Sequence, residues 1–260
     1  MIVQSTGIIA PGVQLTSRTE ALELERLRAE IAARFGNHCE EHYVAPPVIA
    51  KQTAERAGYS NSFPHLLGSV FGAPNGGGIE ETDLVLTPAA CHHLYPMMQG
   101  KTLTGECHMS VEANCYRGEA TSEIGRLRSF RMYEVVRFGA PESVLKWRDS
   151  VFGLAVEWLQ ELGLHPRVAP ASDPFFGRPG VLMAAAQRAG ELKWEALVNL
   201  SDTVEQSVIS ANSHREHFSV AFEFKLPGGS TAHSACLAFG LDRILAAFRH
   251  QHGERFSVVG

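Results

Sequence analysis

The sequence predicts an α+β fold in which an antiparallel sheet is flanked by helices. Three observations support this fold class. Large apolar residues occupy every second position along residues 218–226, which is typical of a strand with one apolar face. Residues 115–139 contain two strand-like segments around a polar loop, as a hairpin does. The strand-like segments follow one another in runs, and the long helical segments lie between those runs.

The composition is that of a soluble globular protein. The chain has 260 residues, of which 45% are hydrophobic and 20% are charged, enough to bury a large core as one or two domains. We find no internal repeat and no linker that would divide it. The net charge of −5 provides no overall attraction to nucleic acid, although a local basic patch could still bind one.

The cysteines and the N-terminus indicate a cytoplasmic protein. The five cysteines show no C-x-x-C spacing, and an odd number in a chain of this size argues for a reducing compartment. The first residues, MIVQSTGIIAPGV, lack the basic segment of a signal peptide. No apolar run approaches the roughly 18 residues that span a bilayer, so we expect no membrane partner.

The N-terminal half is predicted to begin with a long helix. Ser17 and Glu20 form a capping box, apolar residues follow at helical spacing, and Gly36 ends the helix. One face of this helix is apolar, so it should lie on a sheet or on a partner subunit. The next predicted elements are a strand at 42–44, a helix at 48–58, a turn at 61–64, a loop at 71–78, a strand at 83–86 and helical residues to about 98.

The C-terminal half is predicted to contain most of the sheet. Pro141 begins a long amphipathic helix that ends at Gly163, and residues 172–180 form a turn-rich crossing. The remaining predicted elements are strands at 192–200, 204–210, 218–226 and 231–236 and a final helix at 240–249.

The hairpin at 115–139 carries an unusual number of charges. A half-buried hairpin with this many guanidiniums is expected to hold an anion, because arginine binds phosphate or carboxylate in a two-pronged manner and keeps its charge. The arginines are at positions 117, 126, 128, 131 and 137, and they alternate with glutamates at 119, 123 and 134.

Three motifs resemble those of the class II aminoacyl-tRNA synthetases. The hairpin resembles motif 2, in which Arg-x-Glu is followed by a loop, Arg-x-x-x-Phe and an acid. Residues 239–247, FGLDRILAA, resemble motif 3, a glycine turn that opens a helix with an arginine in its first turn. Residues 42–47, HYVAPP, resemble motif 1, a strand that ends in proline. The motifs occur in the order of that superfamily.

Three further segments narrow the resemblance: TPAAC at 87–91, FRMYE at 130–134 and AHSAC at 232–236. They are similar to those of the amino acid:[carrier protein] ligases, bacterial homologues of the archaeal-type seryl-tRNA synthetase that lack a tRNA-binding domain. The resemblance covers about residues 61–252. It implies that residues 1–260 form a single class II catalytic domain without a tRNA-binding domain, and that the chain is a homodimer built around motif 1.

The resemblance also implies roles for the hairpin residues. Arg117 would bind the α-phosphate of ATP and the amino-acid carboxylate, Glu119 would face the adenine amino group, and Phe130 would stack on the adenine ring. Arg126 and Arg243 would hold the γ-phosphate end. Without a ligand, these same residues could instead form salt bridges and core packing, so both readings stay open from the sequence.

A metal site is implied by the same resemblance. It places zinc on Cys91, Glu134 and Cys236, with the fourth position open for the amine of the amino acid. Three protein ligands and one vacancy are typical of a catalytic zinc. Without the resemblance, each cysteine reads as a small buried hydrophobe.

Further ligands of ATP and its magnesium are expected just before motif 3. Glu205 and Asn212 lie where the superfamily places groups that organise ATP and Mg²⁺. Histidines at 92, 93, 250 and 252 could also chelate a metal, but we interpret them as exposed residues at helix ends.

We therefore expect a ligase that joins a small amino acid to ATP as an aminoacyl-adenylate and transfers it to the phosphopantetheine thiol of a carrier protein, with no tRNA involved. The first alternative is a relative that acylates tRNA or another acceptor. The second is a catalytically silent paralogue that binds an amino acid, and the intact Arg117, Glu119, Phe130 and Arg243 argue against it.

Overall fold

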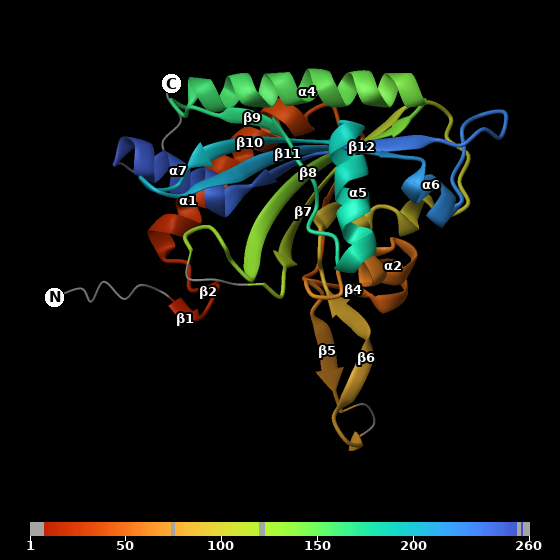
Figure 1. Cartoon of the computed structure of the whole chain (residues 1–260), viewed down its shortest axis with the longest axis horizontal. Coiled ribbons are helices and arrows are strands. Elements are labelled where there is room, and N and C mark those ends of the chain that lie inside the picture. The colour runs from red at the N-terminus through yellow and green to blue at the C-terminus, as the bar shows by residue number, and fades with distance from the viewer. Residues whose placement is uncertain (1–7, 74–75, 120–122, 254–255, 257–260) are drawn as a thin grey trace.

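The computed structural model describes residues 8–73, 76–119, 123–253 and 256. Its centre is a seven-stranded sheet, antiparallel except for one parallel pair at one edge (Figure 1). The predicted antiparallel sheet flanked by helices is therefore confirmed. In spatial order the strands are β3 (Glu41–Val44), β7 (Cys107–Tyr116), β8 (Ser129–Gly139), β12 (His233–Gly240), β11 (Glu205–Arg215), β10 (Lys193–Asn199) and β9 (Arg167–Pro170).

Two smaller sheets flank this centre. One consists of β1 (Ile8–Ala10) and β2 (Val13–Gln14), and the other of β4 (Val48–Ala50), β6 (Glu80–Leu86) and β5 (Ser69–Gly72). The β5–β6 hairpin extends away from the body (Figure 1). Residues 74 and 75 of the predicted 71–78 loop lie outside the described residues.

Three helices cover one face of the central sheet and build the larger core. They are α1 (Arg18–Ile31), continued by a π-helical turn at Ala32–Gly36, α4 (Pro141–Glu161) and α7 (Leu241–His252). Their apolar faces pack on the sheet through fully buried side chains such as Leu27, Trp158 and Ile244. Burial of this continuous apolar surface is the main source of stability. Because these helices occupy one face only, the opposite face of the sheet remains available for the site.

The opposite face is covered only in part. The 3₁₀ turns η3 (Ala90–His93) and η4 (Pro96–Met98) and the short helix α6 (His217–Phe222) pack there around Tyr95. The predicted strand at 218–226 is wrong over its first half, because α6 occupies it. Phe218 and Phe222 are four residues apart, so a helix places both rings against Tyr95, while Val220 is 65% exposed.

Other differences from the sequence predictions concern boundaries. The predicted helix at 48–58 divides into β4 and α2 (Lys51–Arg56), and a one-turn helix α3 (Tyr59–Ser62) follows. The central hairpin consists of two long strands, β7 and β8, and not of two short ones. The sequence predicted no helix where α5 (Gly177–Ala189) stands.

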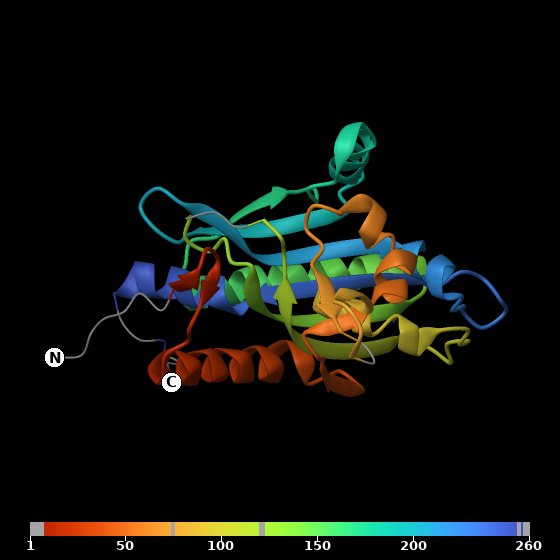
Figure 2. The same ribbon diagram turned by 90° about the horizontal axis from the view of Figure 1, so that it is seen from below.

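Helix α5 stands out from the open face of the sheet (Figure 2). Gly180 is its only buried residue, and Val181 and Leu182 are largely exposed. Because few apolar residues of α5 face the core, its helical pattern was not visible in the sequence. No helix in the described part of the chain is both long enough and apolar enough to span a membrane.

Candidate functional site

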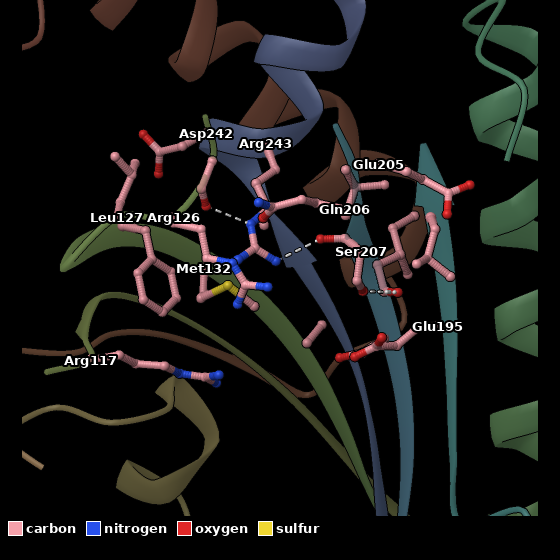
Figure 3. Close-up of a pocket in the computed structure, with 18 of the residues that line it drawn as sticks. Arg117, Arg126, Leu127, Met132, Glu195, Glu205, Gln206, Ser207, Asp242 and Arg243 are labelled. Carbon is pink, nitrogen blue, oxygen red and sulfur yellow. Dashed lines mark hydrogen bonds between the residues drawn. The ribbon is translucent and has the colours of Figure 1, made fainter. Parts of the chain in front are cut away.

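A cavity of about 390 Å³ opens on the face of the sheet that the large helices leave free (Figure 3). Its walls come from the loop between β7 and β8, from β10 and β11 and from the start of α7. Among the residues predicted to bind ATP, it brings together Arg117, Glu119, Arg126, Phe130, Glu205 and Arg243. Asn212 is the one member of that set outside its lining.

Arg117 follows the last residue of β7. Its backbone amide donates a hydrogen bond of 2.9 Å to the carbonyl of Arg128, which fixes the backbone from which the side chain extends. The guanidinium lies 5.6 Å from the centre of the Phe130 ring. Its buried Nε has no hydrogen-bond partner in the described part of the chain. A partly buried donor without an acceptor is costly, so this guanidinium is suited to an anion.

Arg243 lies in the first turn of α7 and is rigidly held. Its Nε donates to the carbonyl of Gly125 (2.9 Å), and its Nη1 donates to the carbonyl of Ser207 (2.8 Å). Burial and the nearby charges of Arg117 and Arg126 lower the pKa of Arg243 to about 10. Three guanidiniums that repel one another in a single cavity would be relieved by a polyanion.

Arg126 and Glu119 lie on the exposed rim of the cavity. Arg126 donates to Glu123 (2.9 Å), and its Nη1 lies 3.7 Å from Glu119. Both side chains of the Arg126–Glu119 pair are more than 40% exposed, so this pair contributes little to stability. Residues 120–122 of the predicted hairpin loop lie outside the described residues.

Glu205 and Asn212 occupy different places on β11. Glu205 begins the strand and forms a two-pronged ion pair with Arg167, and Figure 3 shows its carboxylate turned away from Arg243. Asn212 lies further along the strand and donates from its Nδ2 to the Sγ of Cys236 (3.3 Å). The structure therefore places Asn212 beside the predicted metal ligands.

The three predicted metal ligands come together although up to 145 residues separate them in sequence. Cys91 comes from η3, Glu134 from β8 and Cys236 from β12; all are buried, and their ligand atoms lie within 4.8 Å of one another. The backbone amide of Ala90 donates to Glu134 (2.9 Å), which ties η3 to the sheet.

The electrostatics of this cluster favour a cation. Burial and the charge of Cys236 raise the pKa of Glu134 to about 7. The hydrogen bond between the two thiols raises the pKa of Cys91 and lowers that of Cys236. The groups that act most strongly on Glu134 are two cysteines and backbone amides, with no cationic side chain among them. Two thiols and a carboxylate buried in this way fit a Zn²⁺ ion.

The histidines differ from the exposed helix-end residues that we expected at 92 and 93. His92 is buried among Tyr59, Tyr95 and Phe218, and burial lowers its pKa to about 3. His93 accepts or donates a 3.0 Å hydrogen bond with Thr87. His250 and His252 lie in the last turn of α7, and no histidine belongs to the metal-binding group found among the described residues.

Three charged residues on the β10 side of the cavity were not predicted from the sequence. Lys193 and Glu195 on β10 line the cavity, and the Lys193 ammonium lies 2.6 Å from Asp173 and 3.1 Å from Glu195. Two charges at alternate positions of the predicted 192–200 strand share one face, and this was the available signal. Asp173 belongs to the segment before α5, which no periodicity connects to β10.

Comparison with known proteins finds two similar ligases. The chain is 37% identical to amino acid–[acyl-carrier-protein] ligase 1 of Bradyrhizobium diazoefficiens over 257 residues, covering 90% of this chain and 79% of the relative. It is 38% identical to ligase 2 of the same organism over 230 residues, covering 80% and 69%. The chain matches no protein-family profile.

The structural comparison gives the same fold. Seryl-tRNA synthetase of Methanopyrus kandleri, solved with a tRNA, superimposes with a TM-score of 0.81 at 20% identity over 95% of this chain. The Pyrococcus horikoshii enzyme, solved with ATP, gives a TM-score of 0.72 at 19% identity over 92%. This chain covers 55% and 53% of those two structures, about half of their length. With a class II synthetase catalytic fold and two relatives above 35% identity, the chain belongs to the amino acid–[acyl-carrier-protein] ligase family.

Proposed function

We propose that this chain activates a small amino acid with ATP and transfers it to the phosphopantetheine thiol of a carrier protein. The observation that carries the proposal is the guanidinium of Arg117. It lies over Phe130 in a cavity lined by three more arginines, and its Nε has no acceptor among the described residues. The names of the two similar ligases supply the class of acceptor.

In the first step, a carboxylate oxygen of the amino acid attacks the α-phosphorus of ATP. The bond between the α-phosphorus and the bridging oxygen breaks, and pyrophosphate leaves with that oxygen. Negative charge grows on the α-phosphate oxygens in the transition state, and a prepositioned cation stabilises it. Arg117 is the group placed to do this. Arg126 and Arg243 would hold the γ-phosphate end.

The adenine ring would lie beside Phe130, at the end of the cavity where Glu119 and Arg126 form the rim. An aromatic ring offers a flat apolar surface for the base, and the Glu119 carboxylate can accept a hydrogen bond from its amino group. The exposed positions of Glu119 and Arg126 leave this end open for ATP to enter.

We further propose that Cys91, Glu134 and Cys236 hold one Zn²⁺. A bound Zn²⁺ would supply a Lewis-acid position for the amine of the amino acid. The chain's own contribution is to bury and orient the ligands: Ala90 fixes Glu134, and Asn212 donates to Cys236. Outer contacts of this kind hold ligand atoms in place.

ATP is expected to bring Mg²⁺ with it. The alignment before motif 3 suggested Glu205 and Asn212 for this region. The Arg167–Glu205 pair lies on the rim of the cavity, so we propose only a minor contribution from Glu205. Asn212 would instead lie close to the amino acid and its metal.

In the second step, the acceptor thiol attacks the carbonyl carbon of the adenylate. The bond to the phosphate oxygen breaks, AMP leaves, and the thiol proton passes to solvent. The acceptor supplies the nucleophile itself, so no cysteine of this chain needs to be exposed. All five cysteines are free, and three of them are buried.

We also propose that the chain is a homodimer and that it is cytoplasmic. The edge strand β3 carries Val44 with 73% of its surface exposed, and α1, which precedes it in the chain, exposes Leu22. Five free thiols suit a reducing compartment. Light scattering of the purified protein at several concentrations tests the dimer, and fractionation of the source cells tests the location.

The experiment that tests the function is amino-acid-dependent exchange of labelled pyrophosphate into ATP, run over all twenty amino acids. We expect exchange with one or a few small amino acids. Transfer is then followed with holo carrier proteins and, separately, with total tRNA. If no amino acid supports exchange, the chain is a binding protein. If exchange occurs and only tRNA is charged, the acceptor has been misassigned.

A further inference from the structure

Two side chains near the C-terminal end of α5 hydrogen-bond to the segment before the helix. Arg188 donates to the Oγ of Ser172, which lines the cavity, and Gln187 binds Asp173. The amide oxygen of Gln187 accepts a hydrogen bond from the backbone N–H of Asp173 (2.7 Å). The amide nitrogen of Gln187 donates to Asp173 Oδ2 (2.8 Å). Both polar atoms of the glutamine therefore bind the same residue. We refer to this pair of hydrogen bonds as the Gln187 clamp.

The clamp continues directly into the cavity. The second carboxylate oxygen of Asp173, Oδ1, lies 2.6 Å from the ammonium of Lys193, which also lies 3.1 Å from Glu195. The Lys193 side chain is only 12% exposed. A buried ammonium between two carboxylates is stable only in a fixed geometry. Because Gln187 fixes Asp173 on two sides, it sets that geometry.

The register of the sheet shows which end of the cavity these residues form. Lys193 lies directly opposite Asn212, and Asn212 lies directly opposite Cys236. Glu195 lies opposite Ser210 in the next row, which continues through Ala238 to Glu134. Directly opposed residues share a face of the sheet. Lys193 and Glu195 are therefore level with the predicted metal ligands.

The other end of the cavity is defined by different residues. Phe130 and Gly240 lie further along their strands, four residues from Glu134 and Cys236 respectively, and line the adenine end. Arg117 is among the charges that act on both Asp173 and Lys193. The amino acid, with its amine at the metal ligands and its carboxylate at Arg117, would thus lie beside the wall that Lys193 and Glu195 form.

The segment that leads into the N-terminus of α5 is held by other contacts. The backbone amide of Phe176 donates to the carbonyl of Ser62 (2.9 Å), and the Phe175 ring stacks on Phe63. Removal of the Gln187 clamp should therefore leave the helix in place while releasing Asp173. This separation makes the clamp testable without loss of the fold.

We infer that Gln187 is a positioning residue for amino-acid activation: through Asp173 it holds Lys193 and Glu195 in place as the wall of the amino-acid end of the cavity. The inference rests on the proposed adenylation, and it assigns to α5 a part in amino-acid binding. Gln187 itself touches no substrate. Its effect should appear in the affinity for the amino acid and spare the affinity for ATP.

The test replaces Gln187 by methionine, which has a similar length and helix propensity but cannot form the clamp. Gln160→Met is the matched control, because Gln160 is an exposed glutamine of α4 on the covered face of the sheet. KM for the amino acid, KM for ATP and kcat are measured by pyrophosphate exchange. We expect Gln187→Met to raise KM for the amino acid about tenfold, as is usual for lost hydrogen bonds to a charged group, with KM for ATP changed less than about twofold.

Two further variants test whether Gln187 acts by holding Asp173. If the clamp acts by holding Asp173, Gln187→Met should add little in a chain that already carries Asp173→Asn, so the double variant is not additive. Gln187→Asn, which keeps the amide but is one methylene shorter, should raise KM for the amino acid in the same direction. It serves as the test if the methionine variant fails to fold.

The inference is overturned if the Gln187 variants match Gln160→Met, if KM for ATP rises as much as KM for the amino acid, or if the Asp173 and Gln187 effects add. These results leave the proposed function intact, because the wild-type chain still exchanges pyrophosphate. A wild-type chain that exchanges with no amino acid overturns the proposed function first and this inference with it.

Discussion

The two ends of the cavity are built in opposite ways. At the proposed nucleotide end, arginines from one hairpin and from α7 are partly exposed, and the Nε of Arg117 has no acceptor in the part of the chain that the structure describes. At the amino-acid end, charged groups are buried and bind one another, as Lys193 does with Asp173 and Glu195. The first end therefore has charge to offer a large soluble anion. The second has a buried, charged wall, and we propose that this wall and the neighbouring cluster of Cys91, Glu134 and Cys236 select a small substrate.

This contrast predicts which changes matter most. A change at the nucleotide end should remove transition-state stabilisation, while a change at the amino-acid end should alter substrate and metal binding.

Loss of the metal cluster should abolish activation. Cys236→Ala removes one of three buried ligands, so we expect bound zinc to fall from about one per chain to near zero and exchange to fall below detection. ATP binding should persist, because the phosphate-binding arginines lie elsewhere. Metal analysis measures the bound zinc, and calorimetry measures ATP binding. Cys107→Ala, a half-buried cysteine outside the cluster, is the control. A metal-free Cys236→Ala chain with full activity would make these cysteines ordinary core residues.

Arg117→Ala should reduce the exchange rate by about 10²–10³ with the fold intact, as expected when a charge-stabilising donor is lost. Arg34→Ala is the comparison, because Arg34 is an exposed arginine on the covered side that pairs with Glu161. Rates are measured at saturating ATP and amino acid, with circular dichroism as the check on folding. A near wild-type rate would remove Arg117 from the active site.

Phe130→Leu should weaken ATP binding about tenfold, since an aromatic surface contributes roughly 1–3 kcal/mol when a base stacks on it. KM for the amino acid should change little, because Phe130 lies at the other end of the cavity. Separate titrations of the two substrates check this. Equal increases in both KM values would show that Phe130 supports the whole cavity by packing alone.

Glu205→Gln should give the smallest effect, at most about a threefold rise in KM for ATP. The Glu205 carboxylate forms an exposed ion pair with Arg167, and such pairs contribute about 1 kcal/mol or less. Titration of magnesium in the same assay would reveal a larger role. A hundredfold loss that excess magnesium restores would place Glu205 among the ligands of the ion.

The two ends also differ in how much the sequence could predict. The residues proposed for the nucleotide end could be predicted as a group because they occur within short motifs: Arg117, Glu119, Arg126 and Phe130 lie within fourteen positions, and the structure places all four on one cavity. The metal ligands needed the family resemblance, because sequence spacing carries no information about strands that meet in a sheet. The structure brings those ligands together, and metal analysis remains the test of what they bind.

The parts that the sequence did not predict have physical causes. Phe218 and Phe222 satisfy a period of two and a spacing of four, and packing against Tyr95 decided for the helix. Helix α5 buries only Gly180, so it has no apolar stripe to detect. The contact of Asp173 with Lys193 joins a loop to a strand twenty residues away, and nothing local specifies it.

The central claim is that the activated amino acid passes to a carrier-protein thiol, and the intact mass of the acceptor tests it most directly. Holo carrier protein is incubated with enzyme, ATP and the amino acid that supports exchange, and apo carrier protein and total tRNA are treated in parallel. We predict a mass gain of one aminoacyl group on the holo protein, removed by hydroxylamine as a thioester is, with neither apo protein nor tRNA modified. Charged tRNA together with unmodified holo protein from the source organism would contradict the claim.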